Sequence, residues 1–209
     1  MKIKLRELAL ATFALALCSC AAPTSLKSTW KAPDYHGGPV QKVAVLAVDD
    51  GGTYRPMFEG QFVAQLEQAG QPAFKTLGLL TLPEIRADKE AAAAKLRAAG
   101  ADSVLVVRLV DSVNESTLAP TARTTTTVTS ESVGCFDYVA AYTTTAGEMQ
   151  KSLTLRVNLE TSLYDLATRK KLWTGLTETI LREDTDRLGE VGPLVAKLVA
   201  ALRTDGLIR

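Results

Sequence analysis

Two acidic side chains at the end of an apolar run have the type and spacing to bind a cation. Asp49 and Asp50 follow the run 43–48 and precede two glycines. Open α/β sheets bind ligands beyond the carboxyl ends of their strands, which is where this pair falls. However, one acidic pair supplies too few oxygen ligands for calcium, and a phosphate-binding loop does not place carboxylates beside its glycines. Asp49 and Asp50 are therefore weak metal candidates, with a structural turn as the alternative.

Nucleophilic chemistry has little support. Cys135 has the type of a reactive thiol, but the only histidine, His36, lies far away in a segment rich in proline and glycine. Without a base beside it, a thiol or hydroxyl is a weak nucleophile. Cys135 is otherwise a small half-buried residue beside Phe136. We expect no catalytic residues, no enzymatic activity and no cofactor.

The N-terminal cysteines point to lipid attachment. Basic residues at positions 2, 4 and 6 precede the apolar run Leu8–Leu17, which is shorter than the about 20 residues that span a bilayer, so it reads as a secretory signal. The sequence Leu17–Cys20 resembles the bacterial lipobox, in which a small residue precedes the lipidated cysteine. Ser19 is that small residue, so Cys20 is the expected lipidation site, and plain cleavage with release is the alternative.

Lipidation would divide the chain into three parts. Residues 1–19 are the expected signal peptide, residues 20–40 a flexible tether rich in proline and glycine, and residues 41–209 a single domain. Acyl chains such as palmitate on Cys20 anchor a domain without a transmembrane helix. Because Ala21 and not Asp follows Cys20, we expect the outer membrane, facing the periplasm.

Composition excludes one class of partner. The 209 residues contain 24 Lys and Arg against 23 Asp and Glu, so no basic excess attracts nucleic acid. The hydrophobic share of 46% suits one globular domain with a sizeable core. With lipid on Cys20, Cys135 has no cysteine partner in the mature chain, so we expect no internal disulfide.

The first half of the domain has the pattern of βαβ units. The run Val43–Val48 is almost wholly apolar, which predicts a strand covered on both faces. Pro56 begins a predicted helix that Gly70 ends, and a short strand within 72–77 follows.

A second helix and strand repeat that pattern. Thr81 and Glu84 have capping-box spacing, and the alanine-rich stretch after them predicts a helix closed by Gly100. The apolar run 103–110 predicts a second buried strand, parallel to the first. Between 112 and 150 two threonine runs give no buried face, so we expect ragged strands or a mobile excursion.

The stretch 151–180 predicts two long strands joined by a basic turn. In the first strand apolar residues alternate with polar ones, so Arg156, Asn158 and Glu160 share the polar face. In the second strand we expect Leu172, Leu176 and Ile180 on the buried face.

These elements predict an α/β (α+β) fold. We expect a single mixed sheet with a long C-terminal hairpin and about three helices packed on one face, beginning near Pro56, Glu84 and Leu188. The face that carries Arg156, Asn158 and Glu160 would then remain open to the periplasm.

The hairpin also carries a family resemblance. Glu160–Asp165, Lys171-Leu172-Trp173 and Thr177-Glu178-Thr179 resemble the pattern of an uncharacterised family of bacterial envelope lipoproteins. More distantly, the chain is similar to the fold of the TolB N-terminal domain, the penicillin-binding-protein activator lipoproteins and the curli secretion channel lipoprotein. Arg169-Lys170 stands where such relatives often have glycine, so the likeness leaves the turn type open. The resemblance supplies no catalytic residues and implies a periplasm-facing accessory domain.

Three functions are therefore compatible with the sequence. The first is a non-enzymatic, lipid-anchored envelope protein that docks an envelope partner or itself, with Arg156, Asn158 and Glu160 as interaction candidates. The second is an oligomeric envelope channel or assembly lipoprotein. The third is a small-ligand or cation-binding domain based on Asp49 and Asp50.

Overall fold

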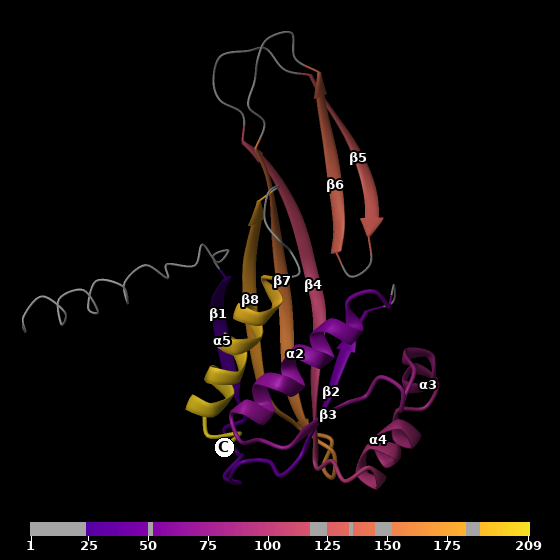
Figure 1. Ribbon diagram of the computed structural model, residues 1–209, viewed down its shortest axis with the longest axis vertical. Helices are drawn as coiled ribbons and strands as arrows, with labels where there is room; N and C mark the ends of the chain where they lie inside the picture. Colours follow the sequence, from indigo (N-terminus) through magenta and orange to yellow (C-terminus); the bar gives the residue numbers. More distant parts are fainter. Residues whose placement is uncertain (1–23, 50–51, 118–124, 134–135, 145–151, 183–188) are drawn as a thin grey trace, which may run out of the picture.

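A mixed β-sheet layered with helices organises the chain (Figure 1). The computed structural model describes residues 24–49, 52–117, 125–133, 136–144, 152–182 and 189–209. Six strands form the main sheet in the spatial order β1-β8-β7-β4-β2-β3. The strands are β1 (Thr24–Lys31), β2 (Val43–Val48), β3 (Ala73–Lys75), β4 (Ser103–Thr117), β7 (Ser152–Asp165) and β8 (Lys171–Arg182), and the helices are α2 (Arg55–Gln68), α3 (Leu82–Ala87), α4 (Lys89–Ala98) and α5 (Val191–Thr204).

The parallel half of the sheet follows the predicted βαβ pattern. Strand β2 runs parallel to both β3 and β4, with Val43 opposite Ala73 on one side and Ser103 on the other. Helix α2 has a proline in its first turn and ends just before Gly70. Gly70 has a φ of +81°, a left-handed conformation that favours glycine and stops the helix.

The alanine-rich helix is divided in two at Asp88. The capping box forms as predicted, because the Thr81 hydroxyl accepts a hydrogen bond from the Glu84 amide and the Glu84 carboxylate accepts one from the Thr81 amide. Asp88 is extended, and its side chain accepts a hydrogen bond of 2.9 Å from the Ala91 amide. Asp88 thus ends α3 and caps α4, which changes the direction of the chain.

The predicted C-terminal hairpin is confirmed. Strands β7 and β8 pair antiparallel from Thr154 opposite Arg182 to Tyr164 opposite Lys171. In the turn, Arg169 has a φ of +62° and its guanidinium pairs with Glu90 at 2.6 Å. The basic turn therefore contains an arginine in the left-handed region, where glycine is less strained.

Helices lie on both faces of the sheet. In Figure 1, α2 and α5 lie against one face, where they enclose the larger apolar core. On the other face, Ala92 and Leu96 of α4 pack in a second core with Ala44 and Leu46 of β2. The expectation that all helices share one face thus holds for α2 and α5 but not for α4. A wholly apolar strand such as β2 needs cover on both sides.

The end of the chain closes the larger core. Leu194, Leu198 and Leu202 form part of the buried face of α5. Beyond it, Leu207 is fully buried, and its carbonyl accepts a hydrogen bond of 2.9 Å from the Val40 amide. In the described part of the chain, no helix is both long and apolar enough to cross a membrane.

Part of the expected tether is a strand of the sheet. Thr24 lies opposite Thr179 of β8, and Lys31 lies opposite Trp173. The prediction of a flexible segment from 20 to 40 is therefore wrong for residues 24–31. Backbone groups of β8 need hydrogen-bond partners whatever the side chains of the partner strand are, so a polar segment can fill that place.

The threonine-rich segment also contains regular strands. Strand β5 (Thr125–Val133) pairs antiparallel with β6 (Phe136–Thr144) as a separate two-stranded sheet. In Figure 1 this pair stands beside the part of β4 that extends past the helices. The expectation of ragged strands is corrected to a regular hairpin for these residues. Cys135 lies outside the described residues.

The prediction of which β8 residues face the core is wrong. Its buried face carries Trp173, Thr177 and Thr179, whereas Leu176 and Ile180 lie on the opposite face. The Thr179 hydroxyl pairs with that of Thr24 at 3.0 Å, so this threonine is buried with its polar group hydrogen-bonded. Leu172 is buried as expected, beside the irregularity that starts the strand.

Candidate functional site

Asp49 has a structural role at the start of α2. Its carboxylate is buried and accepts hydrogen bonds from the backbone amides of Tyr54 at 2.6 Å and Arg55 at 3.3 Å. A carboxylate at this position satisfies amides that the helix leaves without partners. Asp50 lies outside the described residues, and among those described no group of three or more His, Cys, Asp or Glu could hold a metal ion.

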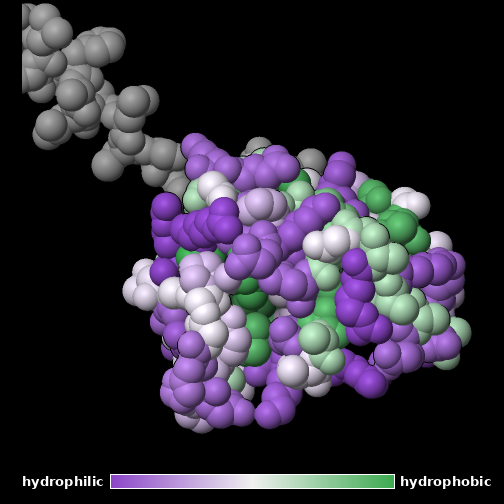
Figure 2. All heavy atoms as spheres, turned by 90° about the horizontal axis from the view of Figure 1, so that it is seen from below, coloured by the Kyte–Doolittle hydropathy of each residue, from purple (hydrophilic) through white to green (hydrophobic). Residues whose placement is uncertain are grey.

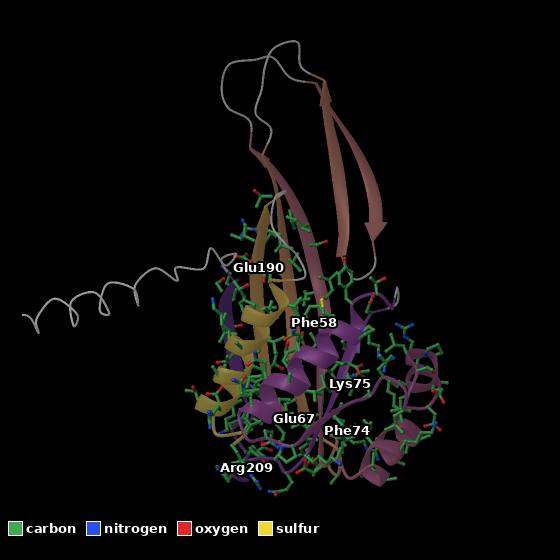
Figure 3. The ribbon with its side chains drawn as sticks, viewed as in Figure 1. Phe58, Glu67, Phe74, Lys75, Glu190 and Arg209 are labelled. Carbon is green, nitrogen blue, oxygen red and sulfur yellow. The ribbon has the colours of Figure 1, made fainter. Side chains whose placement is uncertain are left out.

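A small hollow near the start of α5 offers little room. Phe58 and Glu190 lie at the same end of the helical layer (Figure 3) and line a hollow of about 20 Å³. Its other walls are Val157, Leu159, Thr179, Leu181, Val191 and Leu194. That volume suits about one water molecule and not an organic ligand.

The three polar residues predicted on the hairpin do share one face. Arg156, Asn158 and Glu160 alternate along β7 with the buried Val157 and Leu159. They point away from α2 and α5. Neighbouring strands add side chains to the same surface, which we call the open face: Lys27, Trp30, Arg108, Val113, Arg156, Asn158, Glu160, Ser162, Lys171, Thr174, Leu176, Glu178 and Ile180.

Two carboxylates of the open face are each held between two cations. The Glu160 carboxylate accepts a hydrogen bond of 2.7 Å from the Arg108 guanidinium and lies 3.4 Å from the Lys171 ammonium. Glu178 lies 2.6 Å from the Lys27 ammonium and 2.8 Å from the Arg156 guanidinium. These pairs join residues of β1, β4, β7 and β8, so they fix the relative positions of polar side chains across four strands.

The neighbouring cations lower the pKa of both carboxylates. Hydrogen bonds from Lys27 and then Arg156 lower the pKa of Glu178 below its usual value. At Glu160 burial raises the pKa, but hydrogen bonds from Arg108 and Ser162 outweigh it and the pKa is lowered overall. The polar part of the open face is therefore charged at neutral pH.

Apolar side chains adjoin this charged part. Trp30 of β1 is 48% exposed and lies opposite Thr174, and Val113 of β4 is 46% exposed and lies opposite Arg156. Leu176 and Ile180 are partly buried on the same surface. Ordered charges beside an exposed tryptophan are typical of protein interaction surfaces. The sequence could not reveal Trp30 or Lys27 here, because they come from a segment predicted to be a tether.

A second polar cluster, at the carboxyl end of β2, lies wholly inside the protein. The Arg55 guanidinium donates to Glu59 at 2.7 Å, to the Thr76 hydroxyl at 3.0 Å and to the Leu80 carbonyl at 2.9 Å. The Leu77 amide donates to the other oxygen of Glu59 at 2.7 Å. Arg55 and Glu59 are four residues apart in the sequence, but the predicted helix began at Pro56, and nothing in the sequence indicated that the two side chains are buried.

Other candidates stand apart from these clusters. His36 is exposed in the loop after β1. Cys20 lies outside the described residues, as does the signal segment before it.

Comparison with known proteins finds likeness only among solved structures. No protein-family model matches this chain, and neither does any curated protein. The chain is similar to a PelC dodecamer from Paraburkholderia phytofirmans, at 12% identity and a TM-score of 0.49, over 90% of this chain and 100% of that one. It is also similar to lipoprotein GNA1162 from Neisseria meningitidis, at 17% identity and a TM-score of 0.42, over 78% and 99% of the two chains.

A PDZ domain protein from Parabacteroides distasonis gives a third likeness, at 12% identity and a TM-score of 0.42. It covers 95% of this chain but 40% of that one. At these identities the likenesses concern the fold alone.

Proposed function

We propose that this chain is a non-enzymatic, lipid-anchored protein of the bacterial envelope that docks a second envelope protein on its open face. The lipobox supplies the anchor at Cys20, on the periplasmic side of the outer membrane. The observation that carries the docking role is the combination of exposed Trp30 and Val113 with charges held in place from four strands. A rigid polar surface with apolar anchors loses little side-chain entropy when a partner binds.

Crosslinking in intact cells tests the docking role. A photoreactive benzoylphenylalanine in place of Trp30 should give a discrete crosslinked product, and the same residue in place of exposed Thr204 on α5 should not. Adding Val113→Asp should abolish the product. Equal crosslinking from Trp30 and Thr204, or none from either, would remove the support for this surface.

Globomycin treatment and a Cys20→Ala change test the anchor. Each should leave an unprocessed or mislocalised precursor, because the lipid is attached before the signal peptide is cleaved. Normal maturation without lipid would contradict the anchoring proposal while leaving the docking surface open to its own test.

A second candidate function is assembly into a ring or channel. It is favoured by one observation: β4 continues past Arg108, where β2 ends, and β6, which lies beside this extension, belongs to a separate sheet and is not hydrogen-bonded to β4 among the described residues. An unpaired strand edge is suited to pairing with another chain. A monomeric mass in native mass spectrometry from mild detergent would count against this assembly.

A further inference from the structure

Strand β1 lies at the edge of the main sheet and buries very little. It pairs with β8 alone, and each of its side chains from Leu26 to Lys31 is exposed. Among the described residues, neither apolar core includes a side chain of β1. In Figure 2 purple and white groups line the left side, where β1 and α5 lie, while dark green groups are set further in. Because buried apolar surface supplies most of the stability of a fold, β1 is held mainly by its backbone pairing.

The side-chain contacts of β1 add little to that pairing. Three of them join a lysine to an oxygen atom: Lys27 to the Glu178 carboxylate at 2.6 Å, Lys31 to the Asp205 carbonyl at 2.6 Å, and Lys197 to the Thr24 carbonyl. All three lysines are exposed, and the contacts of exposed lysines contribute little net stability, since water replaces them when they break. Lys27 also lies at an irregularity in the register, between Leu26 and Ser28, which interrupts the ladder.

The rest of the domain has its own support without β1. Strand β8 is paired with β7 on its other side, from Lys171 to Arg182. Trp173 of β8 is fully buried and donates to Asp205, the residue that caps α5, at 2.6 Å. The core beneath β8 therefore stays covered, and β8 keeps a sheet neighbour, when β1 is not paired.

Ala32, the residue after β1, marks the point where the chain is fixed to the domain. It is buried, and its amide donates to the Leu172 carbonyl at 2.9 Å. We propose that β1 leaves β8 as a unit, hinged at Ala32, while the rest of the domain stays folded. Segments with few buried apolar contacts open in this way at a fraction of the free energy of global unfolding. The paired state is the major one, and the open state is a minor conformation in equilibrium with it.

Opening of β1 dismantles part of the open face. Trp30 and Lys27 depart with the strand. Glu178 then keeps only the Arg156 guanidinium of its two cations. The meaning for docking rests on the proposed function: a partner that contacts Trp30 together with Val113 of β4 binds only the paired state and therefore holds β1 in place.

Amide hydrogen exchange of the full mature protein in mild detergent, resolved by NMR, tests the release. Successive amides of β8 point alternately to β1 and to β7, so β8 contains an internal control. Over residues 174–179 the amides directed to β1 should exchange at least tenfold faster than those directed to β7, after correction for intrinsic rates. The paired amides of β1 should share that faster rate. Equal rates for the two sets would overturn the proposal, because β1 would then open only when the domain unfolds.

A disulfide across the two strands gives the matched control. The hydroxyls of Thr24 and Thr179 lie 3.0 Å apart, so Thr24→Cys with Thr179→Cys places two thiols within reach of a bond, in a Cys135→Ser background. Oxidation should bring the amides directed to β1 to the slower rate, and reduction should restore the difference. Unchanged fast exchange in protein that its mass shows to be crosslinked would contradict release of β1.

A second variant tests whether the domain folds with β1 unpaired. Ser28→Pro with Thr29→Pro removes two successive amide donors, one of which must face β8. The amides of β8 directed to β7 should keep their protection, while those directed to β1 lose it. Loss of protection throughout β8 would overturn the proposal. None of these measurements uses a partner, so failure of the docking test at Trp30 leaves them standing, and their failure leaves the open face as a permanently assembled surface.

Discussion

Several hydrogen bonds converge on Glu59. It is fully buried and accepts from Arg55, the Thr76 hydroxyl and the backbone amides of Ala47 and Leu77. Glu59→Ala would leave the Arg55 guanidinium buried without its counter-charge, a change that typically costs about 3–5 kcal/mol. We expect that loss in the free energy of unfolding measured by urea denaturation.

The matched control replaces both partners. Arg55→Met with Glu59→Leu removes the charges together, so we expect most of the lost stability to return. The double variant should still lose order in the turn at 76–80, visible as faster hydrogen exchange at the Leu77 amide. A double variant as unstable as Glu59→Ala would show that packing, and not the orphaned charge, causes the loss.

The Glu84 carboxylate should titrate far below an ordinary glutamate. The backbone amide of Thr81, its hydroxyl and then Lys95 lower the pKa of Glu84 from 4.5 to about 2. A carboxyl with a lowered folded pKa stabilises the fold above pH 4.5, and that stability is lost as the pH falls toward 2. NMR titration of the Glu84 carboxyl carbon should show this, and Thr81→Ala should move its pKa upward. An unchanged pKa in Thr81→Ala would contradict a contribution from the Thr81 hydroxyl, because the Thr81 amide remains in that variant.

At the scale of elements, Gly175 leaves the space that Trp173 fills on β8. A Cβ at position 175 would overlap the Trp173 ring, which is fully buried and donates to Asp205 at 2.6 Å. Gly175→Ala should therefore displace the indole and cost about 1–3 kcal/mol, as overpacking does. Fluorescence would report the displacement, in a Trp30→Phe background so that the buried tryptophan dominates. Gly60→Ala is the control, because nothing lies within 4 Å of its added Cβ.

Elements with strong local signals could be predicted from sequence. The apolar run of β2, the proline and glycine that bracket α2, and the capping box at Thr81 are each decided within a few residues. The break at Asp88 was missed because four alanines favour one continuous helix, although an aspartate with an amide to cap can start a new one.

Elements decided by distant partners could not be predicted. Nothing in the polar residues of β1 indicates a strand, because its place depends on the unpaired edge of β8. The open face could therefore be predicted only in part. Arg156, Asn158 and Glu160 alternate with apolar residues in the sequence, whereas Trp30 and Lys27 belong to a segment far away in the sequence. The prediction of which side of β8 faces the core was wrong because residue type alone does not distinguish a buried threonine from an exposed one.

At the scale of the whole molecule, the C-terminal residues join the segment before β2 to the segment after α2. Leu207 is fully buried, and Gln71, also buried, donates to the Val40 carbonyl at 3.0 Å and accepts from the Arg209 amide at 3.3 Å. Leu207→Ala should lower the free energy of unfolding by about 2–5 kcal/mol because it leaves a cavity in the core. The urea midpoint measures this, and Leu79→Ala, an exposed leucine, should change it by less than about 0.5 kcal/mol.

Strand β1 also determines how far the domain stands from its proposed anchor. With lipid on Cys20, only residues 21–23 separate the acyl chains from Thr24, the first residue of β1. An extended chain advances about 3.5 Å per residue, so this link reaches about 14 Å. The domain would then stay close to the bilayer surface and rotate about its anchor, instead of moving freely at a distance from the membrane. Lys27 and the nearest part of the open face would lie close to the lipid headgroups, within easy reach of a partner held at that same membrane.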